Sequence, residues 1–205
     1  MSNPSEITVQ VVDDDEAVRD SLQLLLEAAG YRARAWSSGP ALLRAPAIEP
    51  GCIVIDVRMP EMDGVTLLAR LRERGIRHPV IIMTGHADVP LAVRAMRAGA
   101  IDFIEKPFSD QVILQAVRDA LAQGVNGAPA SADAAARLAT LTPREHEVLR
   151  ALIAGLPNKS IAYDLGISAR TVEIHRARVM EKMHARSLSE LVRLGLAAGI
   201  NPDAE

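Results

Sequence analysis

Residues 52–60 read Cys-Ile-Val-Ile-Asp-Val-Arg-Met-Pro, an apolar run that stops at Asp56. An uninterrupted apolar run, in place of an alternating one, predicts a strand that is buried on both faces, as the strands of a parallel sheet are. Four more short candidate strands occur, at Val9–Val12, Ala33–Trp36, Val80–Met83 and Phe103–Ile104. The first half of the chain therefore offers five candidate strands.

The segments between these strands have the spacing of amphipathic helices. Val18, Leu22 and Leu25 recur at helical intervals after Glu16. Further helices are expected over Gly64–Glu73, around Val93 and around Val117. Strands that alternate with helices along the chain predict a doubly wound α/β domain with a five-stranded parallel sheet, which we place at residues 1–123.

Polar side chains follow the candidate strands: Asp13 and Asp14, then Asp56, Thr84 and Lys106. The carboxyl ends of parallel strands meet at one crevice, where ligands bind. Crowded carboxylates repel one another, and Mg²⁺, which prefers oxygen ligands, relieves that repulsion. A carboxylate beside a metal can accept a phosphoryl group, while an ammonium and a hydroxyl contact the phosphoryl oxygens. We therefore predict that Asp56 accepts a phosphoryl group, although an Asp-Asp pair by itself would indicate only a solvated turn.

The second half of the chain differs from the first in composition and in hydrophobic periodicity. Residues 124–137 are rich in Gly, Asn, Pro, Ser and Ala, which is typical of a linker, with at most a helical turn near Asp133. From residue 138 to 205 the pattern is helical throughout. Capping boxes are expected to begin at Thr142 and Ser187, and further caps are expected at Asn158 and Ser168. These signals predict a compact all-α domain of four helices, so the chain has two domains.

The helix after Ser168 is expected to have apolar residues on its solvent-facing side, which is unusual for a helix face exposed to water. On a helical wheel Val172 and Val179 face inward, while Ile174 and the small Ala177 face outward. An outward apolar side chain suits the DNA major groove, where it can contact a thymine methyl; a charged, solvated helix is the alternative. We expect base contacts from Glu173, Ile174 and Ala177, and phosphate contacts from Lys159, Arg170, Arg176, Arg178, Lys182 and Arg186.

Tyr163 and His175, both in the second half of the chain, are expected to have structural roles. Tyr163 is expected in the core of the helical domain. His175 is expected on the inner flank of the helix that begins after Ser168, as a structural residue and not as a base contact.

Four stretches resemble the receiver domain of two-component response regulators: Val11–Glu16, Ile55–Gly64, Met83–His86 and Phe103–Phe108. The resemblance implies phosphorylation of Asp56 by a sensor histidine kinase. It also implies Mg²⁺ held by Asp14, Asp56 and the Arg58 carbonyl, with Asp13 acting through water, and it implies Thr84 and Phe103 as a switch pair. Phosphatases of the haloacid dehalogenase type also use a strand-end aspartate, but they carry a general acid two residues later, where this chain has Arg58. We therefore expect a phosphoryl acceptor and not an enzyme.

Residues 141–149, 158–162 and 167–175 resemble the LuxR-type helix-turn-helix, and the two halves together resemble response regulators of the FixJ/NarL class. The class implies an activator that binds double-stranded promoter DNA, works with RNA polymerase, and forms a homodimer on phosphorylation through a surface with Val93 and Arg97. Residues 84–90 and 155–164 are similar to its nitrogen-fixation members. That similarity implies a kinase that senses oxygen through haem, and activation of nitrogen-fixation genes under low oxygen. A member that controls a different pathway is the alternative.

Two rivals fit the sequence less well. A phosphorelay shuttle would need no DNA-binding domain, and an RNA-binding antiterminator would not use a helix shaped for the B-form major groove.

Composition narrows the function classes further. The 205-residue chain has a net charge of −3 and 2% aromatic residues, so a stacking platform for single-stranded nucleic acid is not expected. We expect no membrane association, because no apolar stretch approaches the length of a membrane span and residues 1–6 do not read as an export signal. Cys52, alone in an apolar run, is expected to be a buried thiol in a reducing compartment. These features predict a cytoplasmic protein.

Overall fold

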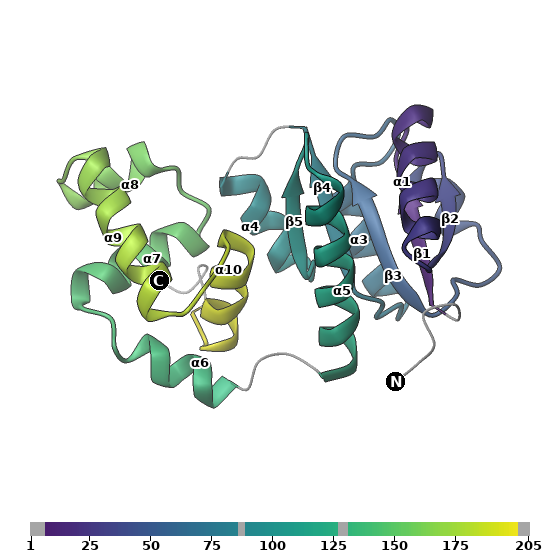
Figure 1. The fold of residues 1–205 in the computed structure, drawn as a ribbon. Helices are drawn as coiled ribbons and strands as arrows, with labels where there is room; N and C mark the ends of the chain where they lie inside the picture. Colours follow the sequence, from purple (N-terminus) through teal and green to yellow (C-terminus); the bar gives the residue numbers. More distant parts are fainter. Residues whose placement is uncertain (1–6, 86–88, 127–130, 201–205) are drawn as a thin grey trace. The chain divides into compact units, whose positions relative to one another are not determined.

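The computed structural model describes residues 7–85, 89–126 and 131–200 (Figure 1). Its contacts divide the chain into two compact units. The first comprises Met1–His86 with Ala98–Asn126, and the second comprises Ala87–Arg97 with Gly127–Glu205. Within the described residues, no helix is long and apolar enough to cross a bilayer.

The first unit contains the predicted five-stranded parallel sheet. Its strands are β1 (Thr8–Val12), β2 (Arg32–Trp36), β3 (Gly51–Asp56), β4 (Val80–Thr84) and β5 (Asp102–Glu105). They lie in the order β2-β1-β3-β4-β5, so β3, which ends at Asp56, is central. Val12 pairs with Ile55, and Asp56 pairs with Met83. Because of this register, β1, β3 and β4 end at one edge of the sheet.

Helices cover both faces of the sheet (Figure 1). They are α1 (Glu16–Ala28), α2 (Gly39–Leu43), α3 (Gly64–Glu73) and α5 (Asp110–Asn126). On one face, Leu26 of α1 and Val117 of α5 pack with Val9 and Val54 in a fully buried cluster. α3 lies on the opposite face, and its Leu67 is fully buried. The two covered faces explain why the strands are apolar without alternation; the short α2 was not predicted.

The second unit is helical. Its helices are α4 (Val89–Arg97), α6 (Ser131–Leu138), α7 (Pro143–Ile153), α8 (Asn158–Leu165), α9 (Ala169–Lys182) and α10 (Leu188–Ala197). The expected cap at Thr142 is confirmed as a full capping box with Glu145, and Ser168 caps α9. The expected cap at Asn158 is wrong, because Pro157 occupies the N-cap position of α8.

Most of the predicted linker, residues 124–137, is helical. α5 continues to Asn126 and α6 spans Ser131–Leu138, while residues 127–130 lie outside the described residues. Alanine has the highest helix propensity, and an ion pair of 2.7 Å between Asp133 and Arg137 supports α6 further. Ala134 is fully buried in the apolar core of the second unit, so α6 is part of that core. The domain boundaries at residues 123 and 138 stay predictions.

Candidate functional site

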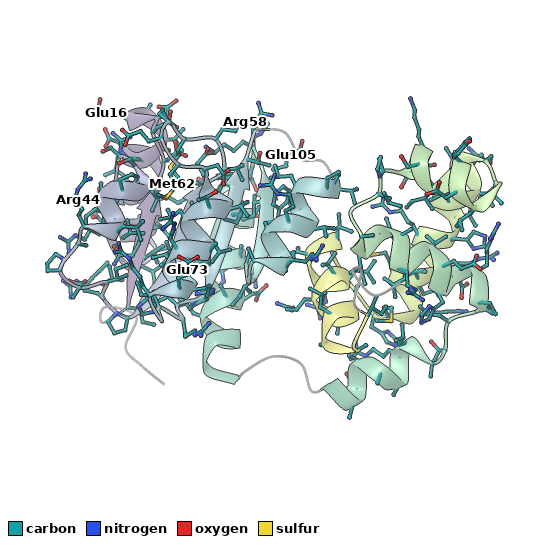
Figure 2. The ribbon with its side chains drawn as sticks, turned by 180° about the vertical axis from the view of Figure 1, so that it is seen from behind. Glu16, Arg44, Arg58, Met62, Glu73 and Glu105 are labelled. Carbon is teal, nitrogen blue, oxygen red and sulfur yellow. The ribbon has the colours of Figure 1, made fainter. Side chains whose placement is uncertain are left out.

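Three of the predicted site residues meet at the carboxyl edge of the sheet. Asp13 follows β1, Asp56 ends β3 and Lys106 follows β5. Nζ of Lys106 lies 2.7 Å from Oδ2 of Asp13 and 2.6 Å from Oδ1 of Asp56, so one ammonium bridges two carboxylates. Figure 2 shows Arg58 and Glu105, the sequence neighbours of this site, at the same edge of the sheet. The strand order brings together residues that are far apart in sequence.

Backbone groups orient both carboxylates. Oδ2 of Asp56 accepts a hydrogen bond from the Arg58 N–H at 2.6 Å, and Oδ1 of Asp13 accepts one from the Asp15 N–H at 3.0 Å. Both carboxylates are almost fully buried. Each therefore uses one oxygen for the backbone and the other for Lys106, which fixes its direction.

Burial and charge act in opposite directions on these groups. Burial raises the pKa of the Asp56 carboxyl, and the hydrogen bond and charge of Lys106 lower it only in part, so the pKa stays above its usual value. Burial by itself would lower the pKa of Lys106, but hydrogen bonds to Asp13 and Asp56 outweigh burial and raise it. Lys106 is therefore a cation at neutral pH, and it lies against the carboxylate that is expected to accept a phosphoryl group.

The predicted ligands of Mg²⁺ are gathered only in part. Asp14 is exposed, whereas Asp13 and Asp56 are buried and share the ammonium of Lys106. Among the residues that the structure describes, no group of three or more His, Cys, Asp or Glu side chains is arranged to hold a metal ion. The donors nevertheless fit the metal chemically, because Mg²⁺ prefers carboxylate and carbonyl oxygens.

The predicted switch residues lie on neighbouring strands. Thr84 ends β4 and is fully buried, and Phe103, in β5, is half-buried. In the register of these strands Ile82 pairs with Phe103 and Thr84 pairs with Glu105. Thr84 thus lies at the carboxyl edge that also holds Asp56.

The predicted DNA-reading helix is α9. Its Val172 and Val179 are fully buried, whereas Glu173, Ile174 and Ala177 are exposed, with Ile174 47% exposed. The two faces are therefore those that the helical wheel predicts. Four of the predicted phosphate contacts are exposed as well: Lys159, Arg170, Arg178 and Arg186.

Two other predicted phosphate contacts are engaged inside the unit. Nη1 of Arg176 donates to Oδ1 of Asn158 at 3.2 Å. Nζ of Lys182 lies 2.6 Å from Oε2 of Glu145, whose side chain is almost fully buried. The Lys182 ammonium therefore joins the end of α9 to the start of α7. The sequence did not reveal this pair, because the two residues are on different helices and only their packing brings them together.

The prediction that Tyr163 lies in the core is wrong, since its side chain is 88% exposed on α8. Ile161 and Ala162 are buried on the same helix and already supply its inner face. The angular position of Tyr163 on α8 turns its side chain to the surface. His175, expected on the inner flank of α9, is half-buried.

Glu145 predicts an acid-dependent stability of the helical unit. Hydrogen bonds from the Lys182 ammonium and the Thr142 backbone lower the pKa of Glu145 to about 2 from 4.5. Because the pKa is lower in the folded chain, the stabilisation is fully present above pH 4.5 and is lost as the pH falls to about 2. We expect about 1–2 kcal/mol, since Lys182 is 34% exposed and water screens the pair.

The Glu145→Gln variant isolates this contribution. We expect the difference in unfolding free energy between the parent chain and the variant to be large at pH 6 and to vanish near pH 2. Urea unfolding followed by the methyl resonance of Met183, which is buried in the same unit, measures it. Glu147→Gln, at an exposed ion pair of α7, is the control. A difference that is independent of pH would contradict the prediction.

Comparisons with known proteins identify the family. Residues 9–118 match the response regulator receiver domain, and residues 139–195 match the luxR family of bacterial regulatory proteins. The transcriptional regulatory protein FixJ of Rhizobium meliloti is 52% identical over 203 residues, which cover 97% of this chain and 99% of the relative. The chain belongs to the two-component response regulators. Its output half is a LuxR-type helix-turn-helix, as predicted.

Further relatives match this response regulator over nearly its whole length. The crystal structure of full-length FixJ from B. japonicum has 49% identity and a TM-score of 0.57, and the match covers 96% of this chain and 99% of that chain. The C4-dicarboxylate transport transcriptional regulatory protein DctR of Rhodobacter capsulatus is 48% identical, with 91% of this chain and 98% of the relative covered. Response regulators of this kind bind DNA and act with a sensor kinase, and they are not normally enzymes.

Proposed function

We propose that this response regulator is a transcriptional activator that binds promoter DNA when Asp56 is phosphorylated. The observation that carries the proposal is the bridge from Lys106 to Asp13 and Asp56 at the edge of the sheet. The same chain exposes Ile174 on a helix whose opposite face is buried. A site suited to phosphoryl transfer and a helix suited to the major groove thus occur in one molecule.

The chemistry of the acceptor site follows from its residues. Asp13, Asp14, Asp56 and the Arg58 carbonyl would hold Mg²⁺, which supplies positive charge that lets an anionic phosphoryl group approach a carboxylate. An oxygen of Asp56 forms a bond to phosphorus while the bond between phosphorus and the kinase histidine breaks. The Arg58 N–H orients the acceptor carboxylate. Lys106 gives up a carboxylate contact and neutralises charge on the phosphoryl oxygens.

The phosphoryl group then acts on Thr84 and Phe103. It offers acceptors to the Thr84 hydroxyl, and the movement of Thr84 leaves space for Phe103 to turn inward. Phe103 has no hydroxyl, so packing alone holds its inward position. We propose that a homodimer forms through a surface that includes Val93 and Arg97. Val93 is 2% exposed and Arg97 is exposed, so phosphorylation has to expose Val93 for that surface to form.

The dimer places two copies of α9 on paired half-sites of promoter DNA. Glu173, Ile174 and Ala177 face the bases, and phosphate contacts come from Lys159, Arg170, Arg178 and Arg186. To contact phosphates, Arg176 would have to leave Asn158 and Lys182 would have to leave Glu145. We therefore propose that these two side chains mainly stabilise the helical unit. RNA polymerase is the partner through which the bound dimer activates transcription.

The pathway is proposed from similarity alone. From the likeness of residues 84–90 and 155–164 to nitrogen-fixation regulators, we propose control of nitrogen-fixation genes under low oxygen, a haem-based oxygen-sensing histidine kinase as donor and a cytoplasmic location; the 52% identity to the transcriptional regulatory protein FixJ is consistent with this choice. Control of a different pathway is the second candidate, because a regulator of C4-dicarboxylate transport is 48% identical. Two measurements distinguish these candidates: phosphoryl transfer from a purified FixJ-type kinase to this chain, and binding of the chain to promoters from the source genome. Transfer from that kinase and binding at nitrogen-fixation promoters would favour the first candidate.

Footprinting on native promoters, with and without Mg²⁺ and acetyl phosphate, tests the proposal. We expect protected, paired half-sites that appear at lower protein concentration after treatment with the phosphodonor. Protection that is identical with and without the donor would contradict phosphorylation-dependent binding, and no protection at any promoter would contradict DNA binding itself.

Ile174→Lys is expected to change the sequence preference of the regulator. The substitution removes an apolar group that can contact a thymine methyl and adds a charged donor, so one base pair of each half-site should lose about 1–3 kcal/mol of discrimination. Binding to a set of duplexes in which each base pair is varied measures the preference. Ile174→Val, which keeps an apolar side chain, should retain it. An unchanged preference in the lysine variant would remove Ile174 from the base-reading residues.

A further inference from the structure

The end of the reading helix α9 is held by a residue from the predicted linker. Nη1 of Arg137, in α6, donates a hydrogen bond to the carbonyl oxygen of Met183 at 3.0 Å. Met183 is the residue that caps α9 at its C-terminus. Nη2 of the same guanidinium lies 2.7 Å from Oδ2 of Asp133, so Arg137 is oriented from its own helix.

A second contact joins the same two segments. Nζ of Lys182 lies 3.3 Å from the carbonyl oxygen of Thr140, just after α6. The Thr140 hydroxyl donates to the carbonyl oxygen of Arg137 at 2.7 Å. Residues 137–140 and 182–183 are therefore joined by two hydrogen bonds. In each, a cationic side chain donates to a backbone carbonyl: Arg137 donates to Met183, and Lys182 donates to Thr140.

α6 is anchored by apolar packing as well as by polar contacts. Ala134 is fully buried in the cluster that also contains Met183, and Leu138 packs against that cluster. The side chain of Arg137 is 29% exposed. The contact between α6 and α9 thus lies at the edge of a packed core and is only partly open to water.

Because this contact lies at the C-terminus of α9, it can affect the orientation of the whole helix. The last carbonyls of a helix lack intrahelical partners, and cations there are favourable. Fourteen residues of helix are about 21 Å long, so a small displacement at the C-terminus tilts the whole of α9. The base-facing Ile174 and Ala177 lie one to three turns before Met183 and move with it. Recognition of base edges depends on donor and acceptor positions at the scale of a hydrogen bond.

We propose that Arg137 is a positioning residue for DNA recognition, which sets the tilt of α9 through the carbonyl of Met183. The inference rests on the proposed function in one respect, namely that α9 reads DNA. It assigns a role in recognition to a segment that lies before the helix-turn-helix and carries none of the predicted DNA contacts. Arg137 acts through α9 and does not itself contact bases.

The test compares two affinities of the full-length chain after treatment with Mg²⁺ and acetyl phosphate. One duplex is a promoter fragment protected in footprinting, and the other has the same length and composition in shuffled order. In Arg137→Ala we expect the ratio of the two affinities to fall about tenfold. The ratio is informative because partial unfolding lowers both affinities by the same factor and leaves their ratio unchanged. Loss of one positive charge likewise acts on both duplexes.

Two further variants sharpen the result. Arg137→Lys keeps a cationic donor near the Met183 carbonyl and is expected to restore most of the ratio. Asp133→Asn removes the charge of Asp133 but keeps a side-chain oxygen that can accept a hydrogen bond from Arg137, so Arg137 stays oriented toward Met183 and the ratio should change less than twofold. An unchanged ratio in Arg137→Ala overturns the inference. A parent chain that binds both duplexes equally instead overturns the proposed function, so the two failures are distinguishable.

Discussion

Replacing Asp56 by asparagine is expected to abolish the gain of a phosphoryl group from acetyl phosphate and Mg²⁺. The amide of asparagine keeps the size of the side chain, and its oxygen can still accept from the Arg58 N–H, which now lies 2.6 Å from the Asp56 carboxylate. It lacks the nucleophilic carboxylate and the negative charge that pairs with Lys106. Intact mass spectrometry measures the phosphoryl group, and light scattering measures the dimer that we expect to be lost with it.

Asp20→Asn is the matched control for this experiment. Asp20 is an exposed residue of α1, so the control makes the same chemical change away from the sheet edge. It should gain the phosphoryl group and dimerise like the parent chain. Dimerisation of the Asp56→Asn variant that persists unchanged in acetyl phosphate would show that the switch does not operate through this carboxylate.

Gly64→Ala is expected to damage both the stability of the first unit and its acceptor site. A Cβ at residue 64 would lie 2.3 Å from the carbonyl oxygen of Asp56 and 2.9 Å from Cγ2 of Ile55. The nearest atom belongs to the backbone of the acceptor residue, so the chain must shift there. We expect a loss of about 2–3 kcal/mol in unfolding free energy. Phosphorylation should also slow, because Asp56 is displaced from Lys106.

The fluorescence of Trp36, the single tryptophan, reports urea unfolding of the first unit. Gly75→Ala is the control, since Gly75 has a φ of +76° and its Cβ would meet no atom within 4 Å. It should lose only about 1–2 kcal/mol from the left-handed conformation and should be phosphorylated at the parent rate. Equal rates of phosphorylation in the two variants would exclude the close approach to Asp56 as a determinant of the site.

The acceptor site could be predicted from the sequence because its residues are tied to strand ends. Asp56 directly follows an apolar run, Lys106 lies two residues after another, and a parallel sheet brings such positions to one edge. The helix caps at Thr142 and Ser168 were also predictable, because each cap depends on residues three positions apart. Local rules are sufficient wherever the interacting groups are near in sequence or are aligned by a regular strand.

Contacts between helices were not predictable in the same way. Lys182 was expected to contact DNA phosphates, but its ammonium binds Glu145 on another helix. Tyr163 was expected in the core, and it is exposed. The small residues of the predicted linker include Ala134, which is fully buried. For Lys182 and Ala134 the outcome depends on which neighbouring helix fills the space beside the residue, and no local pattern records that. For Tyr163 the outcome depends on its angular position beside Ile161 and Ala162, which are the buried residues of α8.

The sequence by itself determined the alternation of strands and helices, the order in which polar residues follow the strands, and the apolar and polar faces of α9. These features depend on the periods of regular secondary structure and on residues close together in the chain. Tertiary structure alone decided that Lys106 bridges Asp13 and Asp56 as an ion pair, and that Arg137 holds the end of α9. The physical reason is that the position of a long cationic side chain is set by whichever carboxylate or free helix carbonyl the packing brings within hydrogen-bond reach.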